Sequence, residues 1–227
     1  MEGDESGATL HAMRLLFKAH PWHGISAGET APAVVSAYIE MVPTETVNYE
    51  IDKSNGHLHV DRPQRFSSQC PAPYGLIPQT RCGEGVATLC VQQTGRAGLQ
   101  GDEDPLDICV LTERTLSHGD VLVRAIPVGG LRTIDRDQVD DKIVAVLEGD
   151  AVYGRFTDIS QCPPAVVNRL NHYFLTYKQD PASPEPTVEL VGVYGRDAAH
   201  EVIRRSMEDY RARFASAAAL LEQALRT

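Results

Sequence analysis

Residues 101–111 read GDEDPLDICVL and join an acidic cluster to the start of an apolar segment. Four carboxylates lie within six of these residues: Asp102, Glu103, Asp104 and Asp107. Carboxylates this close raise one another's pKa and oppose folding unless a positive charge lies among them. Pro105 cannot donate to a sheet ladder, and a bend there would bring Asp107 round to Asp102 and Asp104. The segment LDICVL that follows is apolar on both faces, which indicates a buried strand.

Further strands are indicated on both sides of this stretch. Segments rich in β-branched and aromatic residues occur at 34–42, 46–52, 106–111, 120–128 and 142–147. Ser54-Asn55-Gly56 predicts a tight hairpin turn after the second of them. Residues 62–80 contain four prolines and predict an irregular, packed connection, whereas the Gly-rich residues 81–101 predict a surface loop or insertion.

Helical patterns are found toward the ends of the chain. A short helix is expected around residues 11–19, ended by Pro21. Apolar residues recur at helical spacing after Pro163-Pro164, and residues 197–225 contain neither Gly nor Pro, which predicts a long closing helix. Strands first and helices last predict a mainly β protein, a single barrel or sheet with helices packed against it. We therefore expect an N-terminal extension over residues 1–30 and one domain over residues 31–227.

The composition excludes several classes of partner. The 227 residues carry a net charge of −10, which disfavours binding to nucleic acid or to an anionic membrane. The acidic start lacks the pattern of a secretory signal, and no apolar run approaches the roughly 20 residues that span a bilayer. Five cysteines without a CxxC pair predict reduced thiols, and we expect a cytoplasmic protein.

A second acidic cluster precedes another buried strand. In IDRDQVDDKIVAVL (134–147) the acids are Asp135, Asp137, Asp140 and Asp141, and Lys142 follows them. If the two strands are neighbours, up to seven aspartates gather at one end of a sheet. Aspartates without His or Cys favour Mg²⁺, Mn²⁺ or Ca²⁺ over zinc. Solvated loops are the alternative for each cluster taken alone.

Six motifs resemble those of one enzyme family in the same order. DEDPLD resembles the signature of the family I soluble inorganic pyrophosphatases, in their bacterial form. The spacing of Asp135, Asp140 and Lys142 resembles its second motif. Four shorter matches are YIEMVP with Glu40, YEIDKSNGHLHVDR with Glu50 and Arg62, APYGLIP with Tyr74, and HYFLTYK with Tyr177 and Lys178. The resemblance runs from about residue 36 to 180. It implies a five-stranded barrel of OB type with C-terminal helices packed outside, and a homo-oligomer, most often a hexamer.

The resemblance also implies an activity and a role for each matched residue. The activity is hydrolysis of pyrophosphate to two phosphates by a metal-activated water, with Mg²⁺, or Mn²⁺ or another divalent ion, as cofactor. The implied metal ligands are Asp102, Asp107, Asp135 and Asp140, with Glu40 and Glu50 around them. Asp104 is implied as the base that takes the proton of the water. The implied phosphate-binding residues are Arg62, Tyr74, Lys142, Tyr177 and Lys178.

Several of these residues have simpler alternative roles. Lys142 would also suit a surface ion pair with Asp140 or Asp141, and Arg62 one with the adjacent Asp61. Tyr177 lies on the apolar stripe of its expected helix and would suit the core, and Tyr74 would suit loop packing.

Two positions depart from the family pattern. The family usually carries a phosphate-binding Lys two residues before the hairpin glutamate, and here Asn48 occupies that substrate-binding position without a charge. Ile126 stands beside Pro127 where an Arg is common. Hydrolysis of another phosphoanhydride, such as short polyphosphate, and a weakly active or non-catalytic anion-binding protein therefore remain alternatives.

Overall fold

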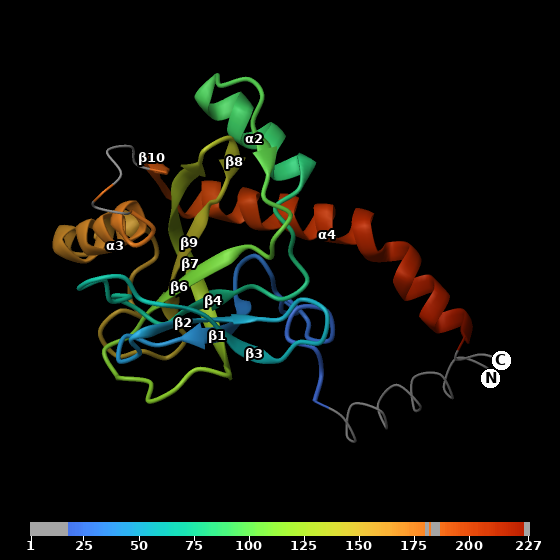
Figure 1. Ribbon diagram of the computed structural model, residues 1–227, viewed down its shortest axis with the longest axis horizontal. Helices are drawn as coiled ribbons and strands as arrows, with labels where there is room; N and C mark the ends of the chain where they lie inside the picture. The colour runs from blue at the N-terminus through green and yellow to red at the C-terminus, as the bar shows by residue number, and fades with distance from the viewer. Residues whose placement is uncertain (1–17, 180–181, 183–186, 225–227) are drawn as a thin grey trace.

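The computed structural model describes residues 18–179, 182 and 187–224, with side chains up to residue 214. Its centre is a closed ring of five strands, in which each strand is hydrogen bonded to two others (Figure 1). In the order of their pairing, the strands are β1 (Val35–Met41), β4 (Tyr74–Leu76), β6 (Asp107–Leu111), β9 (Lys142–Leu147) and β7 (Val121–Asp135). The expected five-stranded, mainly β architecture is confirmed.

Strand β7 is long enough to leave the ring at one end. Its first residues pair with β1, and its later residues pair with β10 (Val188–Gly195). On its other edge β7 pairs with β9 and then with the short strand β8 (Gln138–Val139), which is joined to β5 (Gln100–Gly101). A separate hairpin is formed by β2 (Val47–Ile51) and β3 (Leu58–Pro63).

The strands that follow the two acidic clusters are parallel neighbours. In the pairing of β6 with β9, Asp107 lies opposite Lys142. Successive side chains of β6 alternate between two apolar clusters, so that Ile108 packs into one and Cys109 into the other. Both strands are therefore buried on both faces, as their composition predicted, and both begin at the same end of the sheet.

Helices cover the outside of the ring. Helix α3 (Pro164–Thr176) begins at the expected Pro-Pro pair and places Leu170 and Phe174 in the second apolar cluster. Helix α4 (Arg196–Ala224) is the predicted long closing helix and extends past the ring in Figure 1. No helix in the part of the chain that the structure describes combines the length and hydropathy needed to cross a bilayer.

The prediction of a loop at 81–101 was wrong. Residues Glu84–Thr94 form helix α2, which buries Val86 and Cys90 against the core. One of the glycines that suggested a loop ends the helix instead: Gly95 has a φ of 72°, the left-handed conformation that terminates many helices.

Three other expectations need correction. Strand β4 lies inside the supposedly irregular residues 62–80, and β10 lies between α3 and α4, so the strands do not all precede the helices. The turn of the β2–β3 hairpin is wider than expected, because Gly56 has a positive φ of 75° but Asn55 does not.

The helix expected around residues 11–19 falls almost wholly outside the described residues, so it stays a prediction.

Asp209 of α4 caps the first turn of α2. Its carboxylate accepts hydrogen bonds from the backbone N–H groups of Gly83, Gly85 and Val86 at 2.9–3.1 Å. We expect Asp209→Ala to lower the free energy of unfolding by about 1–2 kcal/mol, because it leaves these donors without a side-chain partner. Urea denaturation measures the effect, and Glu208→Ala, an exposed change on the same helix, is the control. Equal stability of the two variants would contradict the role of the cap.

Candidate active site

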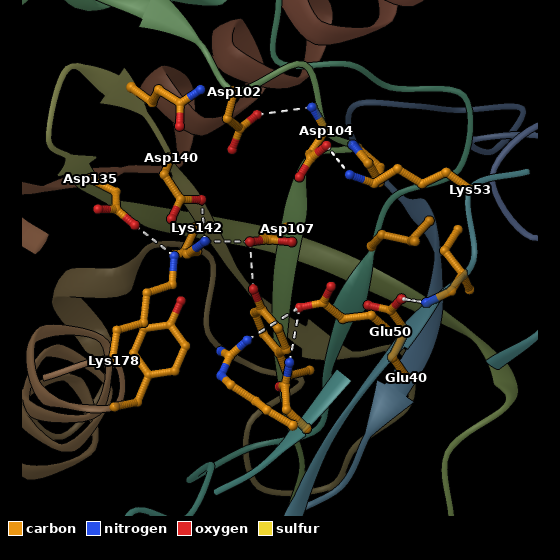
Figure 2. Close-up of a pocket in the computed structure, with 18 residues that line it drawn as sticks. Glu40, Glu50, Lys53, Asp102, Asp104, Asp107, Asp135, Asp140, Lys142 and Lys178 are labelled. Carbon is orange, nitrogen blue, oxygen red and sulfur yellow. Dashed lines mark hydrogen bonds and ion pairs between the residues drawn. The ribbon is translucent and has the colours of Figure 1, made fainter. Parts of the chain in front are cut away.

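A pocket of about 220 Å³ opens where β6 and β9 begin (Figure 2). Seven carboxylates line it: Glu40, Glu50, Asp102, Asp104, Asp107, Asp135 and Asp140. Four cations line it as well: Lys53, Arg62, Lys142 and Lys178. Asn48, Tyr74 and Tyr177 complete the set of residues named from the sequence. The structure thus brings every predicted site residue to one pocket.

The chain bends at Asp104, just before Pro105, and Asp102, Asp104 and Asp107 all line the pocket. Glu103, between Asp102 and Asp104, lies in the left-handed region with a φ of 70°. The Asp104 N–H donates to Asp102 Oδ1 at 3.0 Å, and the Asp104 carbonyl accepts from Cys82 N–H at 2.8 Å. Asp107 then starts β6 beside them.

Only five of the seven clustered aspartates line the pocket. Side chains alternate along a strand, so Asp140 and Lys142 face the pocket and Asp141 between them faces the opposite side. There Asp141 accepts from Arg132 Nη2 at 3.2 Å and from the Tyr194 hydroxyl at 3.1 Å. Asp137 lies exposed in the turn between β7 and β8. The expected gathering of up to seven acids was therefore too large.

Ammonium groups lie between the carboxylates of the pocket. Lys142 contacts both Asp107 and Asp140, with only 3% of its side chain exposed, so the alternative of a surface ion pair is wrong. Lys178 Nζ lies 2.8 Å from Asp135 Oδ2, and Lys53 contacts Asp104 (Figure 2).

The aromatic and guanidinium residues line the pocket and also make contacts of the simpler kind. The Tyr74 hydroxyl donates to Asp107 Oδ2 at 2.5 Å. Tyr177 is buried in the core beside α3 and lines the pocket as well. Arg62 pairs with Asp61, lies 3.9 Å from Glu50 and stacks over the Tyr177 ring at 5.6 Å.

Burial makes several of these carboxylates hard to ionise. Burial, reinforced by the Asp140 carboxylate, raises the pKa of Asp102 to about 8. Burial also raises the pKa of Asp107, against the opposing effect of Lys142, and the pKa of Glu40. Burial alone would lower the pKa of Lys142, but Asp107 and Asp140 outweigh it and raise that pKa. The pocket therefore gains stability from added positive charge.

Asn48 and Lys53 show how the hairpin contributes. Asn48 is buried, and its amide donates to Glu50 Oε1 at 2.9 Å and to Asp61 Oδ2 at 3.2 Å. Lys53, on the turn, was missed by the sequence analysis. The lysine is visible in YEIDKSNG, but only the fold of the hairpin shows that it reaches the pocket.

The donor chemistry of the pocket fits hard divalent cations. The side chains in it that are able to ligate a metal ion are carboxylates, and neither His nor Cys is among the lining residues. Among the described residues, no three His, Cys, Asp or Glu side chains are already gathered around one point. Lys142 lies between Asp107 and Asp140 and offsets part of their negative charge.

Comparison with known proteins identifies the family. The family model for inorganic pyrophosphatase matches residues 37–211, which include every residue of the site. The chain belongs to the inorganic pyrophosphatase family. An inorganic pyrophosphatase of Chlamydia trachomatis is 48% identical over 196 residues, which cover 85% of this chain and 94% of the relative. A soluble inorganic pyrophosphatase of Arabidopsis thaliana is 34% identical over 192 residues. The aligned residues cover 85% of this chain and 79% of the relative.

The solved structures agree with this assignment. The crystal structure of the Thermus thermophilus inorganic pyrophosphatase matches the fold with a TM-score of 0.71, and the two sequences are 30% identical. The match covers 85% of this pyrophosphatase and 99% of the other chain. The resemblance found in six short motifs is therefore confirmed for the fold and for the family.

Proposed function

We propose that this pyrophosphatase hydrolyses inorganic pyrophosphate to two phosphates and uses Mg²⁺, or Mn²⁺ or another divalent ion, to do so. The observation that carries the proposal is the pocket in which seven carboxylates surround three lysines and an arginine. A carboxylate pocket repels a polyanion, and bound cations would reverse that field. The cations of the pocket suit phosphate oxygens, and the spare carboxylates suit metal ions.

The residues divide into metal-binding and substrate-binding groups. Asp102, Asp107, Asp135 and Asp140 would hold the divalent ions, with Glu40 and Glu50 contributing around them. When bound, such ions lower the pKa of a water molecule and offset the charge of the leaving phosphate.

Asp104 is the base in this proposal. Its side chain is 46% exposed and lies among the proposed metal ligands, so it is accessible to a water held in the pocket. Arg62 and Lys178 would bind phosphate oxygens, with the fork of Arg62 able to bond two at once. Tyr74, Tyr177 and Lys142 would complete the phosphate contacts, with Asn48 adding an uncharged donor.

A phosphate-release assay tests the function and its alternatives together. We expect pyrophosphate hydrolysis with Mg²⁺ and none after chelation with EDTA. Faster hydrolysis of tripolyphosphate than of pyrophosphate would favour a different phosphoanhydride as substrate. No release of phosphate from either substrate would favour an anion-binding protein.

Metal binding also has a thermal readout. Mg²⁺ at about 100 times its Kd adds about 2.7 kcal/mol to the free energy of unfolding, which raises the Tm of a chain of this size by about 5–10 °C. Thermal unfolding with and without MgCl₂ measures the shift, with NaCl at equal ionic strength as the control. An equal Tm in the two salts would argue against metal binding.

Two further properties belong to the proposal. We expect a homo-oligomer, a hexamer first, which light scattering tests directly. We place the protein in the cytoplasm, because all five cysteines are free and buried.

A further inference from the structure

We propose that Lys53 covers the Asp104 carboxylate in the free enzyme and transfers its ion pair to a phosphate group of the substrate. Substrate binding would then expose the proposed base. The inference rests on the proposed function and assigns a new substrate-binding residue to it.

The ion pairs of the pocket single out Lys53. Lys142 pairs with Asp107 and Asp140, and Lys178 pairs with Asp135. These partners are all proposed metal ligands. Lys53 pairs with Asp104, the proposed base (Figure 2). Lys53 therefore occupies the position where its ammonium blocks the group that must accept a proton.

The Lys53–Asp104 pair is weak enough to exchange. The Lys53 side chain is 48% exposed and that of Asp104 is 46% exposed, whereas Lys142 is 3% exposed. Exposed ion pairs contribute little to stability, so little is lost when such a pair opens. Pyrophosphate offers several anionic oxygens to the same ammonium, and charge-assisted hydrogen bonds to phosphate are among the strong ones.

The turn that carries Lys53 is held firmly at its backbone. Asp52 Oδ1 accepts from the N–H of Ser54 at 2.8 Å, and Asn55 Oδ1 accepts from the N–H of His57 at 2.9 Å. Gly56 packs so closely against the rings of Pro21 and His20 that an added Cβ would lie within 3.0 Å of them. A fixed backbone with an exposed, flexible side chain lets the ammonium move between two anions without moving the hairpin.

Lys53 also supplies the pocket with a positive charge, which strand β2 does not. Asn48 lines the same pocket but is neutral, and its amide is already bonded to Glu50 and Asp61. Of the side chains that line the pocket from the β2–β3 hairpin, Lys53 and Arg62 are the cations. Removal of Lys53 would leave Arg62, which is itself paired with Asp61.

The test replaces Lys53 by methionine, which keeps the length of the side chain and removes the charge. We expect Lys53→Met to raise KM for magnesium pyrophosphate about tenfold, with kcat within about twofold, because a charged hydrogen bond to substrate is lost while the base stays accessible. Calorimetric binding of methylenediphosphonate, a non-hydrolysable analogue, should weaken by the same factor. Lys53→Arg should retain tight binding.

Two controls separate the site-specific effect from net charge. Lys18→Met removes the same charge from another exposed Lys–Asp pair, with Asp120, and Lys18 does not line the pocket; it should bind the analogue as the wild type does. Asn48→Lys in the Lys53→Met background should restore most of the affinity by returning a cation to the hairpin.

The outcomes distinguish this inference from the proposed function. A wild type that releases no phosphate overturns the proposed function, and analogue binding still decides the role of Lys53. Equal binding of methylenediphosphonate by Lys53→Met and Lys18→Met overturns the inference. A loss of kcat without a change in KM or in analogue binding also overturns it, because Lys53 would then act on the base alone.

Discussion

Asp104→Asn is expected to lower kcat for pyrophosphate by about 10²–10⁴-fold, the range in which general bases contribute. Asparagine keeps the shape of the side chain but cannot take a proton from water. Asp104 is half-buried, and its backbone, not its carboxylate, is bonded to Cys82, so the fold should survive the change. Steady-state phosphate release at saturating Mg²⁺ and pyrophosphate measures the effect.

Asp137→Asn is the matched control for this variant. It makes the same chemical change in an acid of the second cluster that is exposed and does not line the pocket. Its kcat should stay within about twofold of the wild type. Circular dichroism and the Mg²⁺-induced rise in Tm should be unchanged in both variants. A kcat for Asp104→Asn within tenfold of the wild type would assign the proton to another acceptor.

Arg132→Met is expected to lower the free energy of unfolding by about 3–5 kcal/mol, the loss typical when a buried ion pair loses one partner. The side chains of Arg132 and Asp141 are 8% and 1% exposed. Without Arg132 the Asp141 carboxylate is left in the core with the Tyr194 hydroxyl, and its Oδ1 already has no hydrogen-bond partner. Urea denaturation measures the loss.

Two comparison variants show whether the loss comes from the stranded charge. Arg124→Met removes another arginine of β7, whose partner Glu148 is exposed, and should cost less than about 1 kcal/mol. The double variant Arg132→Met/Asp141→Leu removes both charges and should recover most of the stability. Equal stability of Arg132→Met and Arg124→Met would show that the buried Arg132–Asp141 pair stabilises the fold no more than the exposed Arg124–Glu148 pair does.

The sequence was sufficient where pattern and chemistry agree locally. The apolar runs after Asp107 and Lys142 indicated strands buried on both faces, and the six motifs indicated which side chains meet. Helices α3 and α4 were visible in their periodicity and in the proline pair at 163–164. The strands and helices depend on neighbours in the chain, which a sequence displays directly. The meeting of side chains from residues 40 to 178 was indicated only through the family that the motifs resemble.

The missed features depend on contacts between distant segments. Helix α2 is stabilised by Asp209, which lies more than a hundred residues later, so its glycines gave a misleading local signal. The side chains that contact Asp141 come from other elements, Arg132 from β7 and Tyr194 from β10. The exposed Lys53 has no local pattern that marks it as part of a pocket.

The lysines among the carboxylates have a consequence for how the protein is made. Since Lys142 pairs with both Asp107 and Asp140 and Lys178 pairs with Asp135, a newly synthesised chain carries part of the positive charge that these acids need. If the pocket binds divalent ions as proposed, we expect the chain to complete its tertiary structure without them and to take them up afterwards. A shortage of magnesium would then stop catalysis and leave the folded structure intact.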